Sequence, residues 1–226
     1  DVKNQISALA SKIPPKKESG LFRMHIDRAF TKTGFGTIVT GTISSGTLSV
    51  GEMVEILPSK TQSKVRNIQT HGKDVSKAIV GERAAINLNN IGSSDLSRGY
   101  HLSVTNSYKE IDSFIAEISL IDLKKYIIKN NQRIRIHLGT KEVMARIAII
   151  KSFKENDIDK VVAQVKLENK LVVGIGDRFI VRQYSPVVTI AGGIVFYNSS
   201  SDNWKEIKKF GQNLIGKTFE DRIFSI

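Results

Sequence analysis

The sequence predicts an all-β protein of two consecutive β-barrels, with short helical segments at both ends. Three observations predict this fold class. The length of 226 residues exceeds one average domain, so two compact units are expected. Most of the chain consists of short apolar or alternating runs separated by glycine-bearing turns, which is the spacing of barrel strands. Helical spacing of apolar residues occurs only near the two ends.

Residues 1–20 are predicted as a short helix and a connector. Ile6, Leu9 and Ile13 follow helical spacing, and Pro14-Pro15 ends the pattern. Residues 21–105 are predicted as the first barrel, because from Phe22 onward the apolar period changes to two. Its further strand signals lie at residues 37–40, 53–57, 64–69 and 84–88, with turns at Gly46, Gly51, Gly72 and Gly81.

Residues 111–197 are predicted as the second barrel. Strand signals lie at residues 114–120, 133–138, 143–150, 161–167, 179–182 and 189–196, and residues 122–129 are expected to form a helical turn or a loop. Residues 198–226 place Trp204, Ile207, Phe210 and Leu214 roughly at helical spacing. We therefore expect the helical start of a C-terminal extension there. Because the chain begins at Asp1 rather than Met, it is expected to be a piece of a longer protein.

The composition excludes several classes of protein. With 40% hydrophobic and 25% charged residues, the chain can bury a core and is neither disordered throughout nor fibrous. The absence of cysteine removes disulfides and thiolate chemistry, and no two of the four histidines are spaced i, i+4, so no metal site is predicted. Without an apolar run of membrane-spanning length or a signal sequence, we expect a cytoplasmic protein that does not contact a membrane.

The charge predicts a polyanionic partner. There are 34 Lys and Arg against 22 Asp and Glu, a net charge of +12, and nucleic acid is favoured over a membrane surface. The excess is spread over both halves, which suits a partner lying across two domains. A lysine-rich proteome would give the same composition, so charge alone leaves both interpretations open.

Two glycine-rich motifs match, in whole or in part, the sequence patterns of phosphate-binding sites. Residues 211–218 (GQNLIGKT) match the P-loop pattern, but the preceding residues indicate a helix rather than a strand, and too little chain follows for a second strand. Residues 34–36 (GFG) lack the third glycine of a dinucleotide fingerprint. No nucleophile elbow or metalloprotease helix is present. We therefore predict a binding module without a catalytic site of its own.

Six segments carry a resemblance to a known family. Residues 22–30 (FRMHIDRAF) and 34–43 (GFGTIVTGTI) resemble the second domain of translation-factor GTPases, which is a β-barrel after the GTPase domain. Residues 176–182 (GDRFIVR) and 189–195 (TIAGGIV) resemble the end of the third domain, a second barrel. Within that family, residues 68–73 (IQTHGK) and 81–88 (GERAAINL) are most similar to selenocysteine-specific elongation factors.

The resemblance implies a function for the longer protein. It would deliver selenocysteyl-tRNA to the ribosome at recoded UGA codons, as a monomer that uses GTP and Mg²⁺. The GTPase domain would precede residues 1–20, so this chain would hold no cofactor and no GTPase activity. The family's C-terminal extension, which residues 198–226 would begin, binds the mRNA hairpin that directs recoding.

The resemblance also implies an aminoacyl pocket at Asp27, Arg28 and Arg83. General elongation factors carry an acidic residue at the position of Arg28 and a neutral amide at that of Arg83. A selenol is more acidic than a thiol, so two guanidiniums would favour the selenolate over the serine hydroxyl. Asp27 would orient one arginine or contact the α-amino group. Without the resemblance, both arginines are better explained as surface residues or as ordinary salt-bridge partners of Asp27 or Glu82.

Six further residues are implied as tRNA contacts. Gln69 and His71 would lie near the terminal adenosine, and Lys73 would be a further tRNA contact. Gln69 and His71 are equally explained as polar residues flanking a turn. Arg182, Gln183 and Tyr184 match positions where related factors contact the tRNA backbone, and the alternative is a solvated arginine.

Two other functions remain open. The barrels could belong to a general elongation factor, an initiation-type factor or a sulfate-activating GTPase subunit, any of which would be indifferent to selenocysteine. They could also form a standalone basic barrel protein that binds RNA without selecting a cargo.

Overall fold

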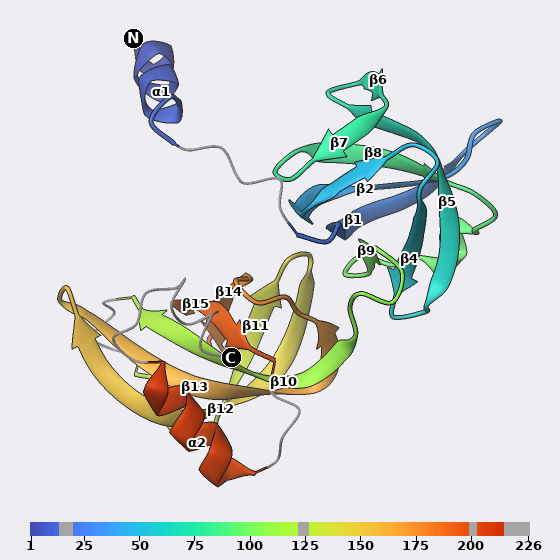
Figure 1. The fold of residues 1–226 in the computed structure, drawn as a ribbon. Helices are drawn as coiled ribbons and strands as arrows, with labels where there is room; N and C mark the ends of the chain where they lie inside the picture. The colour runs from blue at the N-terminus through green and yellow to red at the C-terminus, as the bar shows by residue number, and fades with distance from the viewer. Residues whose placement is uncertain (14–19, 122–126, 199–202, 215–226) are drawn as a thin grey trace.

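The computed structural model describes residues 1–13, 20–121, 127–198 and 203–214. It contains two β-barrels and a short helix at each end (Figure 1). The predicted all-β class with helical segments at both ends is confirmed.

The first barrel is antiparallel throughout. Its strands are β1 (Arg23–Lys32), β2 (Gly36–Ser45), β3 (Thr47–Ser49), β4 (Met53–Leu57), β5 (Thr61–Thr70), β6 (Lys73–Val75), β7 (Lys77–Ile79), β8 (Arg83–Leu88) and β9 (His101–Ser103). The pairing order is β4-β9-β1-β2-β8-β5, and β4 also pairs with β5, which closes the ring. β6 extends β5, while β3 and β7 form a separate pair.

Alternation along β1 shows why this sequence closes a barrel. Phe22, Met24 and Ile26 are at most 2% exposed and pack in one core cluster with Val39, Ile56 and other apolar residues of the ring. Because side chains in a strand point alternately to opposite faces, the residues between them face outward. The outward residues of β1 and its neighbours therefore form the surface on which the candidate site lies.

The second barrel is closed in the order β10-β13-β12-β11-β14-β15. Its strands are β10 (Glu110–Leu120), β11 (Gln132–Leu138), β12 (Lys141–Glu155), β13 (Ile158–Val172), β14 (Arg178–Gln183) and β15 (Thr189–Tyr197). β12 and β13 each have 15 residues and extend beyond the predicted segments, because the hairpin continues in solvent through paired polar residues such as Lys154 and Asp159.

Helix α2 (Trp204–Asn213) packs on the outside of the second barrel, over β12 and β13 (Figure 1). Ile207 is buried against Ile150 and Val162. A Cβ on Gly211 would lie 2.6 Å from Ile150 Cδ1, so this glycine allows a close approach of helix and barrel. Gly211, the first glycine of the P-loop-like motif, is thus inside a helix rather than in a strand-to-helix loop. Residues 215–218 of that motif lie outside the described residues.

Helix α1 (Val2–Ala10) begins at the N-cap Asp1, whose Oδ1 accepts a hydrogen bond from the Lys3 amide at 3.1 Å. None of its residues is buried. The predicted connector at residues 14–19, the first part of the predicted turn at 122–129, and residues 199–202 and 215–226 of the predicted extension lie outside the described residues.

Candidate functional site

The candidate pocket is built around an irregularity in β1. Ile26 pairs with Gly41 and Arg28 pairs with Thr40, so Asp27 is an extra residue, a β-bulge. A bulge interrupts the ladder and redirects the side chain of the extra residue. Gly41 makes the bulge possible, because a Cβ at this position would lie 2.1 Å from the carbonyl oxygen of His25.

Asp27 holds Arg83 by two of its guanidinium nitrogens. Arg83 Nη2 lies 3.1 Å and Nε 3.3 Å from Asp27 Oδ2, and the hydroxyl of Thr40 donates to Oδ1 of the same carboxylate. The Arg83 side chain is 57% exposed and that of Asp27 27% exposed, so this ion pair adds little to stability. Its effect is to orient Arg83 at the surface.

Arg28, the remaining predicted pocket residue, lies opposite Thr40 in the sheet. The registers of β1, β2, β8 and β5 place Arg28, Thr40, Ala85 and Gln69 directly opposite one another in a row. Arg28 is exposed and forms no ion pair with any residue that the structure describes. The structure thus brings Asp27, Arg28 and Arg83 together around Thr40, a residue that sequence reasoning missed because only strand register places it there.

Gln69, His71 and Lys73 lie at the β5–β6 turn. His71 and Gly72 have φ values of 52° and 76°, as in the tight turns that join hairpin strands. The side-chain amides of Asn67 and Gln69 both donate to Asp74 Oδ1, at 2.6 and 2.9 Å, and these hydrogen bonds lower the pKa of Asp74. His71 and Lys73 are exposed. This geometry also fits the alternative interpretation, in which Gln69 and His71 support the turn.

On the second barrel, Tyr184 stacks with two arginines of β11. The guanidinium carbons of Arg133 and Arg135 lie 4.9 and 5.5 Å from the centre of its ring. Arg133 also donates two hydrogen bonds to Glu168, at 2.7 and 2.6 Å, which raise the pKa of Arg133 and lower that of Glu168. Arg182 and Gln183 donate to backbone carbonyls of the following turn, Val187 O at 3.2 Å and Ser185 O at 2.8 Å.

The outer face of the second barrel around Tyr184 also carries basic residues that were not among the predicted tRNA contacts. Arg182 lies opposite Arg135, and Arg133 lies opposite Arg146, which in turn lies opposite Lys166. Like charges directly opposite one another are unfavourable, and the ion pairs of Arg133 with Glu168 and of Arg135 with Glu142 offset part of this repulsion. The alternation of residues 133–138 could have placed Arg133 and Arg135 on one face, but their proximity to Tyr184 depends on the pairing of β11 with β14.

A crevice of about 520 Å³ lies where the two barrels meet, beside the candidate pocket. It is lined by Asp27 and His25 of the first barrel and by Thr140 and Arg178 of the second, among others. Within the described ranges, no group of three His, Asp or Glu side chains is placed to hold a metal ion. No helix in the described part of the chain has the length and apolar character needed to cross a membrane.

Comparison with known proteins agrees with the two-barrel fold. Residues 36–103 match the family model for elongation factor Tu domain 2, and residues 116–201 match that for the β-barrel domain of selenocysteine-specific elongation factors. The fold and these two matches therefore define the tandem barrels of a translation elongation factor. More narrowly, the chain belongs to the selenocysteine-specific elongation factor family.

Individual relatives support the narrower assignment. The chain is 36% identical to the selenocysteine-specific elongation factor of Desulfomicrobium baculatum, over 85% of this chain and 30% of that protein. It is 32% identical to that of Methanocaldococcus jannaschii, over 80% of this chain and 42% of the relative. A crystal structure of a bacterial selenocysteine-specific elongation factor covers 99% of the chain with a TM-score of 0.80 and 25% identity, and the match spans 36% of that structure. The chain thus spans less than half the length of these relatives.

Proposed function

We propose that this chain is the tRNA-binding barrel pair of a protein that delivers selenocysteyl-tRNA to the ribosome. Residues 21–105 and 111–197 are its two barrel domains, residues 1–20 connect to a GTPase domain, and residues 198–226 begin an extension that reaches the mRNA hairpin. In the longer, cytoplasmic protein, GTP and Mg²⁺ act in the GTPase domain.

The grouping of Arg28 and Arg83 around Asp27 carries this proposal. A selenolate between the two guanidiniums would accept charge-assisted hydrogen bonds, each worth roughly 1.5–3 kcal/mol. A serine ester presents a neutral hydroxyl and leaves the arginines without an anionic partner. Asp27 fixes Arg83 through the bonds described above, and its negative charge suits the α-ammonium group of the ester rather than the selenolate.

The arginine face of the second barrel supports the tRNA part of the proposal. Arg133 and Arg135 lie over Tyr184, and Arg182 lies opposite Arg135. Guanidiniums on such a surface can bind phosphates without recognising a base sequence. On the first barrel, His71 and Lys73 project from an exposed turn, and Gln69 ends the row that begins at Arg28. We assign these three residues to contacts with the 3′ end of the tRNA.

The test is protection of the aminoacyl ester from hydrolysis by the full-length protein with GTP. Selenocysteyl and seryl esters on one tRNA body are compared at fixed salt, for the native protein and for Arg83→Ala. We expect strong protection of the selenocysteyl ester by the native protein, and a loss of roughly 10- to 100-fold in preference for Arg83→Ala. Arg66→Ala, which removes an exposed arginine of β5, is the matched control and should keep the preference.

Two results would contradict the proposal. An unchanged preference in Arg83→Ala would remove Arg83 from the pocket. Equal protection of both esters by the native protein would favour a translation factor that does not select selenocysteine.

A further inference from the structure

A turn of the second barrel lies against the strand that carries the candidate pocket. Gly139, between β11 and β12, has a φ of +57°, and a Cβ there would lie 2.2 Å from His25 Nδ1. The backbone of this turn therefore contacts the imidazole of His25 directly. The close approach places the next residue, Thr140, against β1 of the first barrel.

Thr140 bonds to the peptide group that precedes the bulge. Its Oγ1 donates to the carbonyl oxygen of Ile26 at 2.8 Å, and Arg98 Nε donates to the Thr140 carbonyl at 3.2 Å. The Ile26 carbonyl belongs to the same peptide plane as the amide of Asp27. Thr140 therefore fixes the orientation of the peptide plane between Ile26 and Asp27.

Other bonds at this point come from the first barrel itself. The amide of Gly99 donates to the Ile26 carbonyl at 3.2 Å, and the amide of Ile26 donates to Tyr100 at 2.8 Å. Within the described part of the chain, Thr140 is the second-barrel residue with a hydrogen bond to this carbonyl. A bulged residue lacks a partner in the ladder, so such bonds outside the ladder set its direction.

We propose that Thr140 is a positioning residue for cargo selection, which holds the bulge so that Asp27 presents Arg83 to the aminoacyl group. Selection in the first barrel then depends on a residue of the second barrel. This inference rests on the proposed function, because it assigns a supporting residue to the same pocket. Thr140 does not bind the cargo; it acts through the Ile26 peptide group, Asp27 and Arg83.

The geometry links the two candidate surfaces through one strand. β11 carries Arg133 and Arg135 and ends at Leu138, immediately before the Gly139–Thr140 turn. The strand that contributes to the arginine face thus leads into the turn that supports the pocket. Thr140 and Asp27 also line the same crevice of about 520 Å³, so the turn and the bulge face a shared space.

The experiment uses full-length protein with GTP and measures the ratio of selenocysteyl to seryl ester protection. Thr140→Val keeps the shape of the side chain and removes the hydroxyl; we expect the ratio to fall on the order of five-fold, as for the loss of one hydrogen bond. Thr140→Ser keeps the hydroxyl and should retain the native ratio. Thr31→Val removes a hydroxyl that bonds Ser93 further along β1, and should also leave the ratio unchanged.

A ratio separates positioning from a general loss of structure, which would lower protection of both esters equally. Thermal unfolding of each variant checks that it is folded at the assay temperature. The inference is overturned if Thr140→Val keeps the native ratio while Arg83→Ala loses it, and also if Thr140→Val weakens protection of both esters by the same factor. A native protein that protects both esters equally contradicts the proposed function itself, and the positioning role with it.

Discussion

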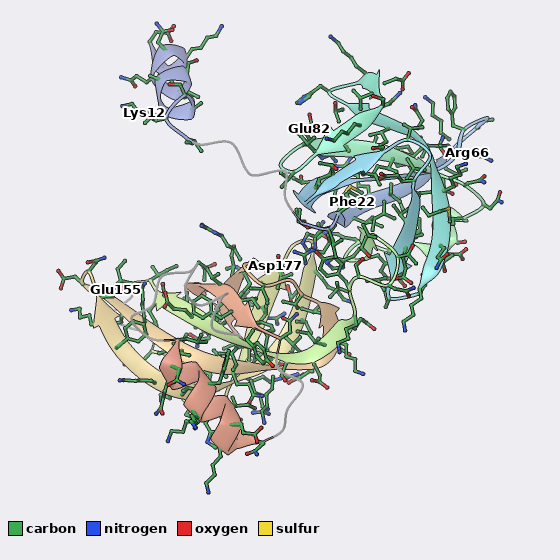
Figure 2. The ribbon with its side chains drawn as sticks, viewed as in Figure 1. Lys12, Phe22, Arg66, Glu82, Glu155 and Asp177 are labelled. Atoms are coloured by element: carbon green, nitrogen blue, oxygen red, sulfur yellow. The ribbon has the colours of Figure 1, made fainter. Side chains whose placement is uncertain are left out.

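Arg23 and Asp177 form an ion pair that joins the two barrels. Arg23 Nη1 donates to Asp177 Oδ2 at 2.7 Å, and Nη2 donates to Oδ1. The two side chains are only 4% and 12% exposed, and the guanidinium carbon of Arg23 lies 5.2 Å from the centre of the Tyr108 ring. Asp177 is at the edge of the second barrel that faces the first (Figure 2). This buried pair therefore joins β1 of the first barrel to the residue that precedes β14 of the second.

Asp177→Asn should strongly destabilise the tandem barrels. Removing one partner of a buried ion pair leaves the other charge uncompensated, at a cost of roughly 3 kcal/mol or more. Asp27→Asn removes the partner of the exposed Arg83 and should cost less than about 1 kcal/mol. Urea unfolding of this chain measures both. Equal small losses would show that the Arg23–Asp177 pair does not stabilise the junction.

Gly139→Ala should weaken the junction through a steric clash. The added Cβ would overlap the His25 ring, and overpacking of this kind costs roughly 1–3 kcal/mol beyond the strain of a positive φ. Gly72→Ala is the control, because Gly72 also has a positive φ (+76°) but has no atom within 4 Å of the added Cβ. The urea midpoint should fall further for Gly139→Ala. Equal shifts in the two variants would contradict a tight contact at His25.

Acid should destabilise the protein through two buried histidines. The rings of His25 and His101 lie 4.3 Å apart, and burial lowers the pKa of His25 to about 4 and that of His101 to about 2. Below pH 6.5 the unfolded chain binds protons that the folded chain does not. Stability from these groups is therefore fully present above this pH. It is lost as the pH falls toward about 4 for His25 and toward about 2 for His101, by up to about 1 kcal/mol per pH unit for each histidine.

Urea unfolding at pH 7.5 and pH 5 measures this dependence. His101→Gln should reduce the difference between the two pH values. His71→Gln changes an exposed histidine at the β5–β6 turn and should keep it. If His101→Gln retained the full difference, the acid effect would have to arise from other groups.

Arg135→Ala should reduce the salt dependence of tRNA binding by the full-length protein. Each phosphate contact that is lost lowers the slope of log K against log salt by about 1. Lys154→Ala removes a charge from the end of the β12–β13 hairpin, where the lysine side chain is 60% exposed, and should not change the slope. An unchanged slope for Arg135→Ala would remove this arginine from the tRNA surface.

Much of the fold could be predicted from apolar periodicity alone. β4 has the predicted bounds, β11 begins one residue before its predicted start, and β14 is one residue longer than predicted at each end. The strands β3, β6, β7 and β9 were missed because three residues give no measurable period. The polar extensions of β12 and β13 were missed because exposed hairpins pair through the backbone and need no apolar alternation.

The candidate site could not be predicted from apolar periodicity alone. Asp27 and Arg28 are adjacent in sequence, but Arg83 is distant, and the resemblance to elongation factors was needed to group them. The bulge that allows Asp27 to reach Arg83 is a property of register, which is set by all of the paired strands together. Thr140 could not be found from the sequence, because its contact with Ile26 spans 114 residues and two barrels.

The bulge also shows how β1 can change in length. Ile26 and Arg28 pair with the adjacent residues Gly41 and Thr40, so deleting Asp27 would leave regular pairing on both sides of the bulge. Phe22, Met24 and Ile26 would keep their places in the core, and the barrel would lose the carboxylate that holds Arg83. The extra residue of β1 would therefore serve the candidate site rather than the barrel.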